Sequence, residues 1–317
     1  MNELEQNFLM HYGIKMRSGR YKYGSGDRPY QHSQFKNAER KVRNSLSNNY
    51  KEFKTEPFDK KKADKRAGFN MDDSIRARSI DAFSVAKAFE PQITKDVINA
   101  VSGTSAKMYG LQHRLKQPTS IAGKIGSDMS EKGISSRDAR DGIKDIIRYT
   151  AVSENKDFVK NYEKIKQNLE QQGYIETKCK NYFQQYKEGK IKHKAVQSNF
   201  EHIKGGYPFE LQFQTPESQA AKELKVPIYE ERRKQGISSK KAEKLEQKMV
   251  DLAEQVPFPP GIEKIKSQNR YEKTPDKYEK LYSDEAQKEV EKWANMSAEE
   301  ELAIYDKLLK EYYKKKG

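Results

Sequence analysis

The amino-acid sequence predicts an α+β fold with a compact middle between polar ends. Only 34% of the 317 residues are hydrophobic, helical and strand-like patterns succeed one another in the middle of the chain, and charged residues dominate both ends. This apolar content does not supply a core for the whole length. We therefore expect a basic, largely disordered arm over residues 1–70, a folded domain over 71–236, and a charged helical extension over 237–317.

The charge of the chain favours polyanionic partners. The net charge is +15 and the pI is about 9.4. In the first 70 residues, sixteen Lys or Arg stand against eight Asp or Glu, and the stretch RSGRYKYGSGDRPYQHS interleaves cations with tyrosine. Such a mixture touches phosphates and stacks on bases but buries little. We expect an arm that forms no core and either contacts DNA or stays solvated.

Several classes of protein are excluded at this stage. No apolar run approaches the ~18 residues of a membrane-spanning helix, and the start, MNELEQNFLMHYG, lacks the order of a secretory signal. We therefore expect no membrane partner. The single cysteine, Cys179, excludes an internal disulfide framework and a cysteine-built zinc site, and we expect a reduced thiol without a role.

The first half of the middle region is predicted to be helical. Apolar residues recur at helical intervals in MDDSIRARSIDAFSVAKAFEPQITKDVINAVSG, and Pro91 divides this stretch into two helices. Pro118 should begin another helix, after an extended lead-in from Arg114 to Gln117, because proline suits a first helical turn and disfavours helical backbone in the residue before it.

The second half alternates strands and helices. DIIRYTAV (145–152) is rich in strand-forming residues, and the helix in KDFVKNYEKIKQNLEQQGY should end at Gly173. HKAVQSNFEH (193–202) and FELQFQT (209–215) read as strands, the latter with Phe209, Leu211 and Phe213 on one face. A helix should follow over 216–225. Towards the C-terminus we expect a helix in SSKKAEKLEQKMVDLAEQV, a rigid break at VPFPPG, and a terminal helix that Ser297 caps.

Candidate phosphate-binding residues cluster in the stretch RLKQPTSIAGKI. Ser120 and Lys124 are four apart on the predicted helix and so share a face, while Arg114 and Lys116 approach from the lead-in. Arginine bonds phosphate oxygens in pairs, lysine offers a point charge, and serine is a neutral donor. These four groups predict a phosphate site, although basic residues of this kind also occur as a solvated face.

Two acids complete the predicted site. Asp145 begins one strand and Glu210 lies near the start of another, so both would reach one Mg²⁺, which prefers oxygen ligands and also takes water and substrate phosphates. This combination indicates metal-assisted phosphoryl or pyrophosphoryl transfer, with a carboxylate available as base. The alternatives are that Asp145 only starts a strand and that Glu210 is an exposed strand residue.

The motifs resemble those of RelA/SpoT-type (p)ppGpp synthetase domains over about residues 75 to 235. The stretch from Arg114 to Lys124 is similar to the family's ATP-binding pattern R-x-K-x-P-x-S-I-x-x-K, and DIIRYTAV resembles its strand with the metal-binding aspartate. HKAVQSNF is similar to Y-K-S-L-H-T-T, FELQFQT to V-E-V-Q-I-R-T, and PESQAAKE to the family's following helix.

The resemblance implies a mixed five-stranded sheet flanked by helices. ATP would be held by Arg114, Lys116, Ser120 and Lys124, and Mg²⁺ by Asp145 and Glu210. Pyrophosphate would pass to a 3′-hydroxyl of GDP, GTP or tRNA, with the acceptor contacting His193, Lys194 and Gln212. The expected location is then the bacterial cytoplasm. No His-Asp dipeptide occurs, so the family's hydrolase domain is not expected.

Four positions depart from the family pattern. Arg148 and Thr150 stand where a glycine and an arginine are usual, His193 replaces a stacking tyrosine, and Gln214 replaces a late arginine. These changes affect the acceptor side most. The stretches PESQAAKELKVPIYEERRK and VPFPPG resemble a divergent branch found in toxin and mobile-element proteins. LMHYGIKMRSGRYKYGSG resembles a short segment of phage head-associated proteins. The alternative function is accordingly a catalytically degenerate structural or nucleic-acid-binding protein, associated with virion proteins.

Overall fold

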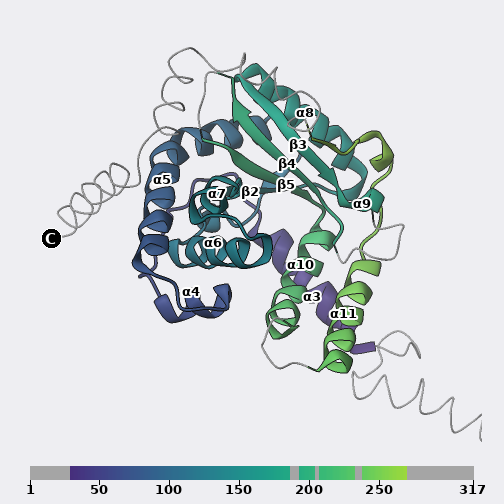
Figure 1. The fold of residues 1–317 in the computed structure, drawn as a ribbon. Helices are drawn as coiled ribbons and strands as arrows, with labels where there is room; N and C mark the ends of the chain where they lie inside the picture. The colour runs from purple at the N-terminus through teal and green to yellow at the C-terminus, as the bar shows by residue number, and fades with distance from the viewer. Residues whose placement is uncertain (1–28, 186–192, 204–206, 233–237, 270–317) are drawn as a thin grey trace, which may run out of the picture.

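The computed structural model describes residues 29–185, 193–203, 207–232 and 238–269 (Figure 1). The helices in these ranges are α3 (Pro29–Ser45), α4 (Lys60–Ala67), α5 (Asp73–Ser102), η2 (Leu111–His113), α6 (Pro118–Lys132), α7 (Ser136–Asp141), η3 (Asn155–Asp157), α8 (Phe158–Gln171), α9 (Tyr182–Gln185), α10 (Pro216–Arg232), α11 (Ser239–Glu254) and η5 (Ile262–Lys264). The strands are β1 (Lys107–Met108), β2 (Ile147–Val152), β3 (Tyr174–Asn181), β4 (Val196–His202), β5 (Phe209–Gln214) and β6 (Gln268–Asn269). The α+β class is therefore as predicted.

The strands form one mixed sheet in the order β1-β2-β5-β4-β3-β6. β2 and β5 run parallel, and every other neighbouring pair is antiparallel. Within the described residues the sheet has six strands rather than the expected five: the four longer strands β2, β5, β4 and β3, with the two-residue strands β1 and β6 at its edges. The parallel pair matters most for the site, since it sets Arg148 opposite Glu210.

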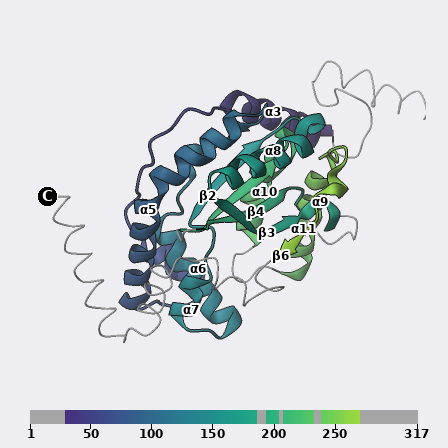
Figure 2. The same cartoon turned by 90° about the horizontal axis from the view of Figure 1, so that it is seen from above.

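One face of the sheet is covered by helices and forms the core. The alternation predicted for FELQFQT is observed: the Phe213 ring meets Tyr162 of α8 at 4.9 Å between centroids, and Phe209 meets Tyr149 at 5.8 Å. α8 lies against this face, with α5 alongside (Figures 1 and 2). Glu210 and Gln212 point to the opposite face, away from this core.

The prediction that Pro91 separates two helices is wrong. α5 is a single 30-residue helix with Pro91 inside it. Proline removes one backbone hydrogen bond from a helix, but burial on both sides of Pro91 holds α5 together. Glu90 is 4% exposed, and Thr94, at 1%, bonds the Tyr149 hydroxyl at 2.6 Å between oxygens. These contacts with the sheet continue the helix through the proline.

The prediction that residues 1–70 form no core is wrong for their described part. α3 packs on α10 and α4 packs on α6, and both helices bury apolar side chains: Phe35, Val42, Ala63 and Ala67. These residues lie four or seven apart on their helices, so a few of them suffice to make an apolar stripe. Arg43 of α3 also pairs with Glu217 of α10 at 3.3 Å. The head-protein-like segment lies outside the described residues.

The C-terminal region contributes to the same fold as far as residue 269. α11 begins after the Ser238 cap, as its sequence predicts, and packs on α10. Asn181 at the end of β3 donates to the backbone oxygens of Ile262 and Ile265 at 2.9 and 2.8 Å, which holds the segment leading to β6. The helix predicted from Ser297 lies outside the described residues. None of the helices in the described part of the chain is long and apolar enough to cross a membrane.

Candidate active site

The two predicted acids lie at the same edge of the sheet. Asp145 comes two residues before β2, and Glu210 is the second residue of β5. Because these neighbouring strands are parallel and Ile147 pairs with Phe209, both strands begin at the same edge. Burial raises the pKa of Glu210, and the negative charge of Asp145 raises it further, although Gln212 and Arg148 oppose the shift. The two carboxylates are thus close enough to interact.

Asp145 forms an ion pair with Lys116. The ammonium of Lys116 lies 2.7 and 2.6 Å from the two carboxylate oxygens, and both side chains are largely buried. Burial opposes the charge of Asp145, but Lys116, with Arg148 and Lys124, outweighs burial, so the pKa of this carboxyl is lowered. Burial also lowers the pKa of Lys116, against the attraction of Asp145. The pair therefore keeps two opposite charges together in a largely buried position just before β2.

Backbone pairing explains why Lys116 reaches Asp145. The amide of Lys116 donates to the oxygen of Ile146 at 2.8 Å, and the amide of Arg148 donates to the oxygen of Arg114 at 2.7 Å. The lead-in thus runs antiparallel to the start of β2. Pro118 begins α6 as predicted, and Gln117 before it is extended. Arg114 itself has helical backbone at the end of η2, so the extended part is shorter than expected.

Arg114 does not face the cleft. Its side chain is 1% exposed and pairs with Glu90 of α5. Its guanidinium also donates to the oxygens of Lys51 and Leu111 at 2.6 and 2.8 Å, and to the Tyr50 hydroxyl at 2.6 Å. The guanidinium has its hydrogen-bond partners inside the protein, so this structure gives it a positioning role between α5 and the lead-in rather than the expected contact with ATP.

Ser120 and Lys124 lie one turn apart on α6, as expected. Ser120 is partly exposed, and Lys124 pairs with Asp128 while 37% of its side chain remains exposed. Lys124 is also among the cations that lower the pKa of Asp145. Three of the four predicted ATP-side groups, Lys116, Ser120 and Lys124, therefore remain on the side of the cleft that Asp145 occupies.

Arg148 is a site residue that sequence reasoning treated only as a departure. Its guanidinium lies 3.8 Å from the Asp145 carboxylate, and its strand position is directly opposite Glu210. It lowers the pKa of both acids, though burial is the larger influence on each. With 41% of its side chain exposed, it presents a cation between the two carboxylates. Only the register of β2 against β5 reveals this position.

Lys222 was also missed. This residue of α10 donates to the Gln212 side-chain oxygen at 2.6 Å, and the Gln212 amide donates to Glu210. Burial, then the charge of Arg148, lowers the pKa of Lys222 to about 8. Gln212 therefore links a lysine to the Glu210 carboxylate instead of standing alone on the acceptor side. The sequence holds no local signal for this link, because α10 returns to the sheet only in the fold.

The other two predicted acceptor residues, His193 and Lys194, have different neighbours. The His193 ring meets Tyr182 at 5.6 Å, and burial, followed by the charges of Lys225 and Lys222, lowers its pKa to about 3, so the imidazole is neutral near pH 7. Lys194 donates to the oxygen of Val256 at 2.6 Å and lies 4.4 Å from the Phe258 ring centroid. Lys194 thus anchors the segment after α11 and is 3% exposed.

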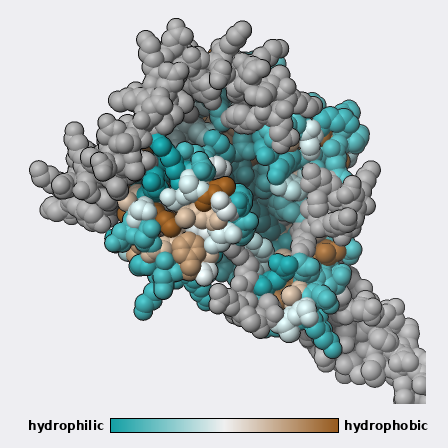
Figure 3. Space-filling view, in the orientation of Figure 1, coloured by the Kyte–Doolittle hydropathy of each residue, from teal (hydrophilic) through white to brown (hydrophobic). Residues whose placement is uncertain are grey.

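The donor set fits a magnesium ion. In the described residues no three His, Cys, Asp or Glu side chains converge, so a closed protein cage is absent there. Magnesium, however, is usually held by one or two carboxylates together with water and substrate phosphates. Asp145 and Glu210 supply that number of carboxylates at one edge of the sheet. The space-filling view shows a hydrophilic hollow over this face, between the lobe of α4, α6 and α7 and the helices α10 and α11 (Figure 3).

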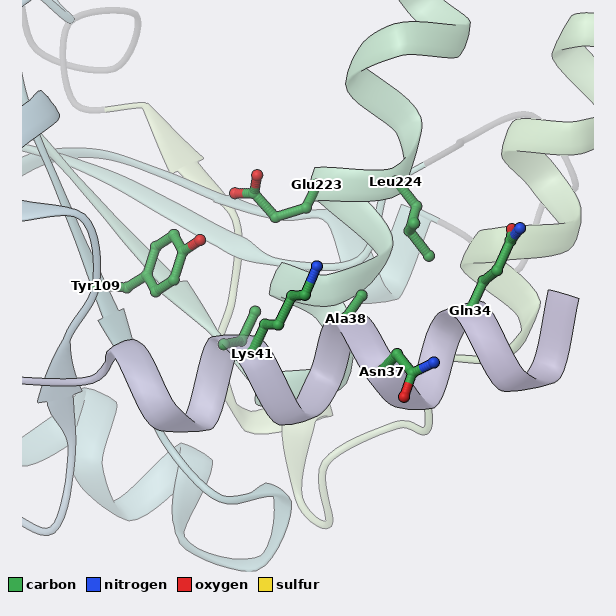
Figure 4. A pocket seen from close by; sticks show the side chains of 8 residues that line it. Gln34, Asn37, Ala38, Lys41, Tyr109, Glu223 and Leu224 are labelled. Atoms are coloured by element: carbon green, nitrogen blue, oxygen red, sulfur yellow. The ribbon is translucent and has the colours of Figure 1, made fainter.

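A second cavity, of about 480 Å³, lies between α3 and α10 (Figure 4). Tyr109 and Lys41 face Glu223 across it, and burial followed by the charge of Glu223 raises the pKa of Tyr109. Glu223 follows Lys222 on α10, yet Lys222 reaches Gln212 on the sheet. α10 therefore separates this cavity from the acids.

Cys179 also lies outside the site. It is buried, and burial raises the pKa of its thiol to about 11, which makes the thiol inert as expected.

Comparison with known proteins gives similarity in structure only. No protein-family model matches the chain. No curated protein matches its sequence. Among solved structures, the chain is similar to small alarmone synthetase 2 of Bacillus subtilis, with 16% identity over 55% of this chain and 90% of that one and a TM-score of 0.38.

Two further solved structures are similar over a comparable region. The Type VI effector Tas1, in complex with its immunity protein, has 15% identity over 55% of this chain and 93% of that one, with a TM-score of 0.37. Small alarmone synthetase 1 of Bacillus subtilis, bound to its product pppGpp, has 15% identity over 44% and 70%, with a TM-score of 0.32. All three TM-scores are below 0.5, and the functional proposal therefore rests on the side chains of the cleft.

Replacing Lys116 with methionine is expected to raise the pKa of Asp145, because burial then acts without the compensating ammonium. In the wild type the lowered pKa stabilises the fold above the unfolded-state pKa of aspartate, and this contribution disappears as the pH falls through the folded-state pKa. Carboxyl ¹³C NMR titration of Asp145 measures the shift. Lys132→Met, which removes a partner of Asp128 instead, is the control; an unchanged or lower pKa in Lys116→Met would contradict the pairing.

Proposed function

We propose that this protein transfers a pyrophosphoryl group from ATP to a nucleotide hydroxyl. The observation that carries the proposal is the convergence of Asp145 and Glu210 at one sheet edge, with Lys116 and Arg148 paired with Asp145 and the charge of Lys124 acting on it. Two carboxylates surrounded by cations suit a polyphosphate and its metal, because each charge then has a counterion. The 3′-hydroxyl of GDP, GTP or tRNA is the acceptor that the motif resemblance implies.

The roles follow from the position of each side chain. Lys116, Lys124 and the Ser120 hydroxyl hold the phosphate chain, and Asp145 and Glu210 would hold Mg²⁺. Magnesium, when bound, would neutralise charge on the phosphates. Glu210 accepts the proton of the acceptor hydroxyl, and its raised pKa makes it a better base than an ordinary glutamate. Lys222 acts through Gln212, which orients the Glu210 carboxylate.

The proposed transfer forms one phosphorus–oxygen bond and breaks another. The acceptor oxygen attacks the β-phosphorus of ATP while its proton passes to Glu210. The bond between the β-phosphorus and the oxygen shared with the α-phosphate breaks, and AMP leaves with that oxygen. Positioning and charge neutralisation supply most of the rate enhancement in transfers of this kind.

Incubation of the full-length protein with [γ-³²P]ATP, Mg²⁺ and GDP, GTP or uncharged tRNA tests the proposal. The expected result is a labelled acceptor with an equal amount of AMP, since transfer of one phosphate would release ADP instead. Asp145→Asn should abolish both products. If neither AMP nor a labelled acceptor forms with GDP, GTP or tRNA, the proposed enzyme activity is rejected. The alternative, a catalytically degenerate nucleic-acid-binding or virion-associated protein, is then favoured.

A further inference from the structure

Helix α4 comes unusually close to α6 because two glycines of α6 face it. A Cβ at Gly126 would lie 2.5 Å from the Ala67 Cβ, and one at Gly123 would lie 2.6 to 2.9 Å from side-chain carbons of Arg66. The two glycines are three residues apart, so they lie on one face of α6. Glycine is unfavourable in a helix interior. The presence of glycine at both positions therefore indicates that α6 needs close packing against α4.

The close contact carries Arg66 towards the phosphate side of the cleft. The Arg66 stem lies across Gly123, next to Lys124. Its positive charge acts on Lys116, together with that of Arg148. Lys116 in turn holds Asp145. Arg66 therefore approaches the cluster of Lys116, Lys124 and Asp145 from a segment that the sequence analysis assigned to a disordered arm.

Two guanidinium groups approach this cluster in the described residues: that of Arg148 from β2, 3.8 Å from the Asp145 carboxylate, and that of Arg66 from α4. Arg114, the arginine expected there, is committed to Glu90 in the interior. Arg66 is exposed and keeps its stem fixed against α6. Guanidinium groups bond two phosphate oxygens at once, which lysine does not do.

We propose that Arg66 is a nucleotide-binding residue that contacts the phosphate chain of ATP beside Lys116 and Lys124, so that α4 belongs to the nucleotide site. The inference rests on the proposed function, because it takes ATP as the ligand. It assigns a functional contact to the N-terminal region that neither the motif nor the resemblance covers.

Isothermal titration calorimetry with Mg·ATP and the full-length protein tests this contact. Arg66→Ala is expected to raise the Kd for ATP about tenfold or more, the effect of losing one charge-assisted contact. Arg66→Lys should fall between the wild type and alanine, because it keeps the charge but not the paired bonding. Lys65→Ala is the matched control: it removes a neighbouring cation from the same last turn of α4, and its Kd should stay within about twofold of the wild type.

The outcomes separate the two proposals. Thermal unfolding of each variant shows whether α4 still packs, and Arg66→Lys retains the stem against Gly123 if alanine destabilises the helix. Wild-type ATP binding with unchanged affinity in both Arg66 variants would overturn the role of Arg66 and leave the proposed function standing. Equal losses in Lys65→Ala and Arg66→Ala would also overturn it, since a general charge effect would then suffice. No ATP binding by the wild type would overturn both.

Discussion

Replacing Glu210 with glutamine is expected to slow pyrophosphoryl transfer by about 10²- to 10⁴-fold, the usual contribution of a positioned general base. Glutamine keeps the size of the side chain and accepts the hydrogen bond from Gln212, so the fold is retained. The loss should appear in the single-turnover rate with [γ-³²P]ATP. Glu163→Gln, the same change at an exposed position of α8, is the control and should leave the rate unchanged.

The same variant should be more stable than the wild type near pH 7. Burial raises the pKa of Glu210 in the folded state, so ionising it there costs more than in the unfolded chain. This cost is absent at acid pH, where the carboxyl is protonated in both states, and develops as the pH rises through the folded-state pKa. The difference in Tm between Glu210→Gln and the wild type should therefore grow from acid to neutral pH. Full activity, or a Tm difference that shrinks over this range, would refute the role given to Glu210.

Replacing Arg114 with alanine is expected to cost about 3–5 kcal/mol of the free energy of unfolding, as when one member of a buried ion pair is removed. The change leaves Glu90 without its ion-pair partner at 4% exposure and leaves the backbone oxygens of Lys51 and Leu111 without this donor. Denaturant-induced unfolding measures the loss. Arg40→Ala, on an exposed part of α3, should cost less than about 0.5 kcal/mol.

A double variant distinguishes structure from ligand binding. Changing Arg114 and Glu90 together to methionine removes both charges and should recover much of the lost stability. Because the Arg114 side chain is 1% exposed and its guanidinium is held by Glu90 and the Tyr50 hydroxyl, the double variant should bind Mg·ATP with nearly wild-type affinity. A large loss of ATP affinity in the folded double variant would instead support the contact between Arg114 and ATP that the motif predicts.

Local patterns were sufficient for the elements that carry strong periodicity. The alternation in FELQFQT identified β5, the helical stripe ending before Gly173 identified α8, and the pattern of SSKKAEKLEQKMVDLAEQV identified α11. Each depends on neighbours along the chain, which the sequence shows directly. β3 was missed because YIETKCKN mixes charged and apolar residues without clear alternation, and its strand conformation comes from pairing with β4 on one side and β6 on the other.

The sequence by itself determined the α+β class and the residue types of the site: two acids at strand starts and a basic stretch at the start of a helix. Only the tertiary structure decided which cations face those acids. Arg114 turns inward to Glu90, while Arg66, Arg148 and Lys222 approach the cleft from α4, β2 and α10. The physical reason is that burial and charge proximity depend on which distant segments pack together, and no short stretch of sequence contains that information.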